Sequence, residues 1–260
     1  NGAGWKYNTN WLAGNQCDWY GVLCNSDEYV EHLHLIHNQL RGTISESSIV
    51  YFKNLISLYL NGNQLAGPIP ESIVNLENLK SLRLNRNGLT GTIPKSIGNL
   101  EKLTDVNLRI NQLTGTIPAS IVNLENLSSL NLGNNLLTGS IPALIENLEK
   151  LAYVNLRNND LTGTIPESIG NLENLDNLDL SNNKLTGPIP ETIGNLMNLT
   201  DLFLDHNQLT GPIPETIKNL ENLKYLELIG NEFAEPSPQW LKDFCNRPSL
   251  ECALDLPDQY

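Results

Sequence analysis

The sequence contains little positive charge and no long hydrophobic run. Only 16 of its 260 residues are lysine or arginine, against 29 aspartates and glutamates, which gives a net charge of −13. Nucleic acids and anionic membranes both attract excess positive charge, so neither is expected as a partner. No apolar stretch approaches the ~20 residues of a membrane-spanning helix, so direct membrane insertion is not expected either.

The signatures of catalysis are missing too. The chain has no Ser-His-Asp order, no HExxH and no glycine-rich phosphate loop. We therefore expect no enzyme activity, no catalytic residues and no cofactor. His32, His34 and His37 lie close together on one predicted strand, but a zinc site needs a third or fourth ligand that the surrounding sequence does not supply. Exposed polar residues are the preferred interpretation of these histidines, and no metal is expected.

One motif is repeated along most of the sequence. "LTGTIPKSIGNL" begins at Leu89, "LTGTIPASIVNL" at Leu113 and "LTGTIPESIGNL" at Leu161. The unit LxxLxLxxNxLxGxIPxxIxNLxN has the 20–29-residue period and the spacing of leucine-rich repeats. Its asparagines recur every 24 residues after a first step of 25, at Asn38, Asn63, Asn87, Asn111, Asn135, Asn159, Asn183, Asn207 and Asn231.

Each residue that recurs in the unit has a physical role. Leu82 and Leu84 alternate with polar neighbours, which predicts a strand with one buried face. Asn87 ends that strand, and we expect such asparagines to stack into a buried hydrogen-bonded ladder. Gly91 allows a tight bend, and Pro94 fixes the backbone without needing a donor. A single unit buries too little apolar surface, so the repeats must stack and their ends must be capped.

The four cysteines lie only near the two ends of the chain. "CDWYGVLC" contains Cys17 and Cys24, and "CNRPSLEC" contains Cys245 and Cys252. Two short disulfide loops that hold the end caps are expected in an oxidising compartment. The alternative, one zinc site made of four thiolates, would require the two ends of a solenoid about 40 Å long to meet, at ~4.8 Å per strand.

The repeat with "LTGTIP" and the cap sequence "CDWYGVLC" resemble the plant-type extracellular leucine-rich-repeat proteins. The resemblance implies a right-handed α/β solenoid with a parallel concave β-sheet and about nine repeats of 24 residues, capped by disulfides at both ends. The expected domains are an N-terminal cap over 1–29, from which the first helix of the family's cap is trimmed, repeats over 30–232 and a C-terminal cap over 233–260. The family consists of receptor-like ectodomains and secreted inhibitors, in plants and also in protists and algae.

Specificity is expected where the repeat varies, on the solvent-facing side of the concave sheet. Arginines there lie toward the N-terminal and middle strands and carboxylates toward the C-terminal end, so we expect an electrostatically bipolar trough. Arg83, Arg86 and Arg109 could converge on a carboxylate or sulfate. The candidate ligand-binding residues are Tyr59, Arg83, Arg86, Arg109, Tyr153, Arg157, Asp179, Asp201, Phe203, Asp205 and Tyr225.

Two alternatives stay open for these residues. The charged side chains could be solvated decoration, neutralised by neighbours such as Asp105. The Arg-x-Arg pair with which receptors of this family hold a peptide carboxylate is not present at Arg83 and Arg86, so that role is not carried over. A structural or ice-binding solenoid is the alternative function, because threonines such as Thr114 and Thr116 recur at matching positions.

The expected function is therefore recognition of a protein, peptide or acidic glycan outside the cell or at its surface. Sequons at Asn126 and Asn198 fit N-glycosylation of a secreted chain. A second copy of this chain is a further candidate partner.

Overall fold

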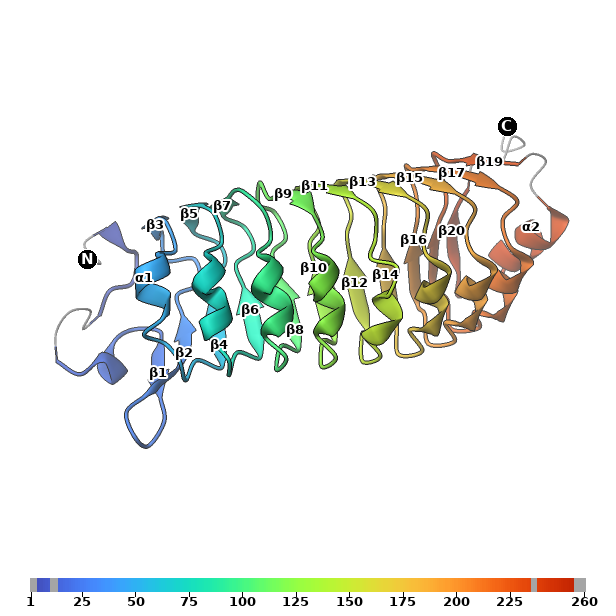
Figure 1. Cartoon of the computed structure of the whole chain (residues 1–260). Helices are drawn as coiled ribbons and strands as arrows, with labels where there is room; N and C mark the ends of the chain where they lie inside the picture. The colour runs from blue at the N-terminus through green and yellow to red at the C-terminus, as the bar shows by residue number, and fades with distance from the viewer. Residues whose placement is uncertain (1–3, 10–13, 235–237, 255–260) are drawn as a thin grey trace.

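The repeats stack into one elongated, curved solenoid, with the N-terminus at one end and the C-terminus at the other (Figure 1). This computed structural model describes residues 4–9, 14–234 and 238–254. Parts of both expected caps, residues 1–3, 10–13, 235–237 and 255–260, lie outside the described residues.

One face of the solenoid is an 11-stranded sheet in which β2 to β20 pair in parallel and β1 pairs with β2 in antiparallel orientation. β20 follows the last repeat and extends the sheet from the C-terminal cap. The strands are β1 (Val22–Cys24), β2 (Val30–His34), β4 (Ser57–Tyr59), β6 (Ser81–Arg83), β8 (Asp105–Asn107), β10 (Ser129–Asn131), β12 (Tyr153–Asn155), β14 (Asn177–Asp179), β16 (Asp201–Phe203), β18 (Tyr225–Glu227) and β20 (Glu251–Ala253).

The core lies behind this sheet and contains mainly leucine and isoleucine. Leu82 and Leu84 are fully buried, as their alternation with polar residues predicts. The expected asparagine ladder is confirmed. Asn135 donates through Nδ2 to the carbonyls of Leu108 at 3.1 Å and Leu132 at 2.9 Å, and its Oδ1 accepts from the Leu113 amide at 3.1 Å. Each asparagine thus ties its own turn to the preceding repeat.

The Leu-Thr-Gly segments form two further sheets, of three and six strands. Their strands are β3 (Arg41–Gly42), β5 (Gln64–Gly67) and β7 (Gly88–Leu89), then β9 (Thr114–Thr116), β11 (Leu136–Gly139), β13 (Asp160–Gly163), β15 (Lys184–Gly187), β17 (Gln208–Gly211) and β19 (Glu232–Phe233).

The threonines of these sheets do not align as the sequence columns suggested. Strand pairing places Thr116 beside Thr138 and Thr92 beside Thr114, whereas Leu136 is the partner of Thr114. The expected in-register threonine ladder is therefore wrong, because each strand is shifted by two residues relative to the next. Several threonine methyl groups also pack over the next glycine. A Cβ built on Gly139 would lie 2.8 Å from the Thr116 methyl.

The convex side of the solenoid carries short helices, most of them 3₁₀. They are η2 (Gln16–Asp18) and α1 (Glu46–Ile49) near the N-terminus, then η3 (Glu71–Asn75), η4 (Lys95–Asn99), η5 (Ala119–Asn123), η6 (Ile145–Asn147), η7 (Glu167–Asn171), η8 (Glu191–Asn195) and η9 (Glu215–Asn219), and finally α2 (Gln239–Cys245) in the C-terminal cap.

A glycine at one repeat position allows some of these helices to pack closely. Gly98, Gly170 and Gly194 occupy it in three repeats, and a Cβ there would lie 2.2, 2.3 and 2.4 Å from a backbone oxygen of the next helix. Val122 and Glu146 occupy the same position around η6. The three-residue η6 also presents fewer residues to its neighbours than the five-residue helices η5 and η7 do. We name the turn around η6 the loose joint.

Both ends are closed by disulfides, as expected. Cys17 is bonded to Cys24 and Cys245 to Cys252. In the C-terminal cap, the Arg247 guanidinium lies 5.0 Å from the centre of the Phe244 ring and donates to the Glu221 carbonyl at 2.8 Å. This arginine satisfies backbone acceptors that the last repeat would otherwise leave open.

Candidate functional site

Side chains cross the concave face in rows, because the sheet pairs each repeat with the same position of the next. The register gives a middle row that contains His34, Tyr59, Arg83, Asn107, Asn131, Asn155, Asp179, Phe203 and Glu227. Two residues later, an outer row contains Ile36, Asn61, Asn85, Arg109, Gly133, Arg157, Ser181, Asp205 and Ile229. The residue after each outer-row position forms a turn row.

The N-terminal strands carry a satisfied stack of side chains. The His34 and Tyr59 rings stack at 4.2 Å, and Arg83 lies 4.9 Å from the Tyr59 ring centre. Arg83 Nε then pairs with Asp105 Oδ2 at 2.7 Å. Asp105 thus neutralises Arg83, as expected if Arg83 is a solvated surface residue and not part of a ligand-binding site. Arg83 is therefore less available to a ligand than an unpaired arginine would be.

The histidines beside this stack share one hydroxyl. His32 Nδ1 and His34 Nε2 lie 2.7 and 2.6 Å from Ser57 Oγ. Burial, followed by the nearby His32 and Arg83, lowers the pKa of His34, so the neutral ring is favoured. Across the part of the chain that the structure describes, no three His, Cys, Asp or Glu side chains are arranged to hold a metal ion.

The middle strands bring together an arginine pair that the sequence did not single out. Arg109 and Arg157 flank Gly133 in the outer row, one strand to either side. The Nε atom of each arginine is buried and has no hydrogen-bond partner. Gly133 is buried, and the space that a Cβ there would take is filled by Asn155 Oδ1 at 2.3 Å and Arg157 Cγ at 3.1 Å. Arg157 Nε faces Asp179 Oδ2 at 4.0 Å, beyond hydrogen-bond length, whereas Arg109 has no ion pair among the described residues.

Arg86 is not part of this pair. It lies in the turn row with a φ of 57°, and it comes from the strand before Arg109. Of the three arginines expected to converge, Arg83 is paired with Asp105 and Arg86 belongs to a different row. Arg157, two strands beyond Arg109, shares its row. The sequence signal that would have revealed the pair is the glycine between them.

The C-terminal strands carry a cluster of carboxylates, which we name the acidic cluster: Asp179, Asp205 and Glu227. Asp179 accepts from Asn155 Nδ2 at 2.8 Å and from Ser181 Oγ at 2.6 Å, and its Oδ2 lies 4.0 Å from Arg157 Nε. Burial raises the pKa of Asp179. Burial, with the charges of Asp205 and Asp179, also raises the pKa of Glu227.

Asp205 lies at the centre of this cluster. Its Oδ2 is 2.9 Å from His206 Nδ1 and accepts from Asn182 Nδ2 at 3.3 Å, whereas its Oδ1 is buried without a partner. Asp179 and Asp205 are 5% and 7% exposed. The expectation that they are solvent-facing is therefore wrong, because neighbouring strands are close enough for adjacent side chains to cover them.

Aromatic residues flank the acidic cluster. The rings of Phe203 and Tyr225 stack with their centres 6.4 Å apart. Tyr153 begins β12, and its hydroxyl accepts from Asn155 Nδ2 at 3.3 Å. Asp201 begins β16 and accepts a short hydrogen bond from Thr200. All the predicted aromatic and acidic site residues thus lie on one sheet, but only some of them are in contact.

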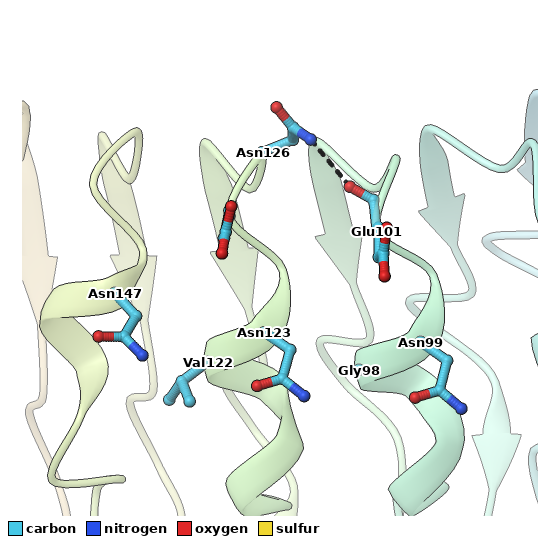
Figure 2. Close-up of a pocket in the computed structure, with 8 residues that line it drawn as sticks. Gly98, Asn99, Glu101, Val122, Asn123, Asn126 and Asn147 are labelled. Carbon is cyan, nitrogen blue, oxygen red and sulfur yellow. Dashed lines mark hydrogen bonds between the residues drawn. The ribbon is translucent and has the colours of Figure 1, made fainter.

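A polar hollow of about 400 Å³ lies on the convex side, next to the loose joint. Figure 2 shows Asn99, Asn123 and Asn147 side by side along it on successive helices. The sequon residue Asn126 lies at its edge, where Nδ2 donates to the Glu101 carbonyl at 2.9 Å (Figure 2). Asn126 Oδ1 also accepts a hydrogen bond from Lys150 Nζ at 2.6 Å. Asn198 donates to the Glu173 carbonyl at 2.8 Å.

Family comparisons agree with the repeats. A model described as a leucine-rich repeat region matches residues 137–251, and leucine-rich-repeat models match residues 101–161, 54–76 and 78–100. A probable leucine-rich repeat receptor-like protein kinase of Arabidopsis thaliana is 41% identical over 69 residues, which are 26% of this chain and 6% of that protein. The chain therefore spans only a small part of the curated relatives that it matches.

Solved structures extend the match to almost the whole chain. The ectodomain of the Arabidopsis thaliana receptor kinase GASSHO1/SCHENGEN3, in complex with CASPARIAN STRIP INTEGRITY FACTOR 2, is 35% identical with a TM-score of 0.85, over 94% of this chain and 32% of that one. The Arabidopsis receptor kinase HAESA, with the peptide hormone IDA and the co-receptor SERK1, is 34% identical with a TM-score of 0.75, over 85% and 41% of the two chains.

A third similar structure is a plant ice-binding protein, which is 27% identical with a TM-score of 0.72, over 95% of this chain and 92% of that one. Among the described helices, none has the length and hydrophobicity needed to cross a bilayer. Repeat sequence, solenoid, terminal disulfides and similarity to receptor ectodomains agree. The chain belongs to the leucine-rich-repeat proteins, as an extracellular member of the plant type.

Proposed function

We propose that this chain is a non-catalytic recognition module that binds an extended peptide along its concave face. The observation that carries the proposal is Arg109, which has a buried, unpartnered Nε and no ion pair among the described residues, in one row with Arg157, whose side chain is 41% exposed and has only Asp179 at 4.0 Å. A ligand carboxylate or sulfate would supply an acceptor for the outer N–H groups of these two guanidinium groups. Two guanidinium groups also suit a planar, charged oxygen ligand better than lysines would.

The relatives support a peptide in particular. The HAESA structure contains a peptide hormone, and its ectodomain shares this solenoid. The face is open and broad, which suits an extended chain better than a reaction that must exclude water. Tyr153, Phe203 and Tyr225 add aromatic surface beyond the arginine pair. The Asn126 and Asn198 sequons would place glycans away from this face.

The proposal can be tested with a panel of secreted-type peptides and acidic glycans. The informative variant is Arg109→Glu with Arg157→Glu, and the control with equal charge change is Lys95→Glu with Lys102→Glu on the convex side. A peptide that binds the wild type and the control is expected to lose at least tenfold in affinity for the arginine variant. Binding that is indifferent to the arginine variant, or confined to glycans, would contradict the proposal.

Ice binding is a second candidate, favoured by one observation: the similarity to the plant ice-binding protein covers nearly all of both chains. Thr114 and Thr138 are exposed on the second sheet, but their strands are staggered by two residues. Thermal hysteresis of the wild type, and its loss in Thr114→Leu with Thr138→Leu, would support this candidate. No hysteresis at millimolar protein would remove it.

A further inference from the structure

The acidic cluster carries more buried negative charge than its surroundings neutralise. Asp179 has Arg157 at 4.0 Å, and Asp205 has His206 at 2.9 Å. No ion pair to Glu227 is recorded among the described residues. Like charges held close together destabilise the fold unless a proton or another cation joins them.

Asp205 indicates where the cation would bind. Its side chain is 10% exposed, its Oδ2 is used by His206 and Asn182, and its buried Oδ1 has no partner. Glu227 is paired in the sheet with Phe203, two residues before Asp205, so the two carboxyl groups come from adjacent repeats. The Glu227 carboxyl group is itself an acceptor when ionised. Two adjacent acceptors with an unmet lone pair define a site for a donor that carries positive charge.

The chemistry of the site favours an organic cation over a metal ion. The described His, Cys, Asp and Glu residues do not offer the close triplet of ligands that a metal needs. The stacked rings of Phe203 and Tyr225 come from the same two repeats as Asp205 and Glu227. An ammonium or guanidinium group can use both features, because its charge pairs with carboxylates and its stem or plane packs on aromatic rings.

We propose that the acidic cluster binds a lysine or arginine side chain of the peptide ligand, and so fixes the direction of the peptide on the sheet. This inference rests on the proposed function. Gly133, between the arginine pair, follows β10, and Asp205 follows β16. The three strand steps from β10 to β16, at ~4.8 Å each, span about 14 Å. An extended chain covers about 3.3 Å per residue, so the acidic and basic groups of the ligand lie about four to five residues apart.

The test is selection from a library of random 12-residue peptides displayed on phage, with wild-type protein as bait. Enriched peptides are expected to contain an acidic group and, four to five residues away, a lysine or arginine. Replacing that basic residue with norleucine should lower affinity for the wild type at least tenfold. The same replacement should have less than a twofold effect on the variant Asp205→Asn with Glu227→Gln.

The control variant Glu149→Gln with Glu173→Gln removes the same charge from the convex side and should behave as the wild type. Melting temperature gives a second readout. Glu227→Gln removes repulsion within the cluster and is expected to raise it, whereas a purely structural carboxylate would lower it on substitution. Enriched peptides whose binding is indifferent to Asp205 and Glu227 would overturn this inference and leave the proposed function standing. No enriched peptide would overturn both.

Discussion

The two halves of the concave face differ in whether their charged side chains are fully paired within the protein. In the N-terminal half, Arg83 is paired with Asp105 and stacked on Tyr59, so its charge is met within the protein. In the C-terminal half, Asp205 keeps a buried oxygen without a partner. The arginine pair of Arg109 and Arg157 lies between the two halves. Under the proposed function, a binding surface is marked by unmet hydrogen-bonding capacity among the charged residues, and not by charge alone.

Removing Asp179 should have the largest effect on stability. Asp179→Ala leaves the Asn155 amide and the Ser181 hydroxyl and amide without their acceptor. At about 1 kcal/mol for each lost bond, partly offset by relief of repulsion in the acidic cluster, we expect a loss of about 2 kcal/mol in the free energy of unfolding. Urea denaturation measures this loss.

The matched substitution in the other half is Ser57→Ala, which removes the hydroxyl shared by His32 and His34. It should cost about 1 kcal/mol. A larger loss for Ser57→Ala than for Asp179→Ala would reverse the comparison between the halves.

A turn-row substitution should have an intermediate effect, in the stabilising direction. Ile110 has a φ of 56°, in the left-handed region that β-branched residues rarely adopt. Asn134, Asn158 and Asn182 occupy the equivalent position in later repeats. Ile110→Asn is therefore expected to raise the melting temperature and to add about 1 kcal/mol to the free energy of unfolding.

The reciprocal change Asn182→Ile places a β-branched residue in the half that contains the acidic cluster. It should lower the free energy of unfolding by a similar amount. It also removes the hydrogen bond that Asn182 donates to Asp205, so any additional loss in the free energy of unfolding measures that hydrogen bond. If Ile110→Asn lowers stability, the left-handed turn is not strained in the way that the backbone indicates.

The smallest expected effect is a pH dependence specific to the acidic half. Folding raises the pKa values of Asp179 and Glu227, so the folded state binds more protons than the unfolded state between the ordinary and the raised pKa. Stability from these two groups therefore falls as the pH rises through that window, and the penalty is complete above the raised pKa values. Unfolding free energies of the wild type and Glu227→Gln, measured from pH 4 upward, should differ in slope there, with the variant flatter. Parallel curves would contradict the assignment.

Much of the fold could be predicted from the 24-residue period. Leu82 and Asn135 lie where the repeat places them, because those positions depend on contacts common to every repeat. The two disulfides could be predicted because the cysteines occur as close pairs at the two ends, where the stack must be capped. The stagger of Thr114 and Thr138 could not be read from aligned columns, since register in the second sheet depends on the geometry of the turn between the sheets. The domain boundaries stay a prediction.

Less of the candidate site than of the fold could be predicted from the sequence. The pairing of Arg83 with Asp105 depends on which rotamers meet across two strands. The burial of Asp205 depends on its neighbours in adjacent repeats. The packing of the Asn155 and Arg157 side chains over Gly133 is likewise not specified by the repeat pattern. The role of the listed concave residues in binding stays a prediction until the variants are measured.

The loose joint has a geometric consequence for the arginine pair. The curvature of a solenoid follows from the small rotation between one repeat and the next, so packing on the convex side contributes to the shape of the concave sheet. Arg109, Gly133 and Arg157 belong to the three successive repeats whose helices are η5, η6 and η7. Val122 and Glu146, on the opposite side of the molecule, therefore help to set the curvature of the sheet where the two arginines lie.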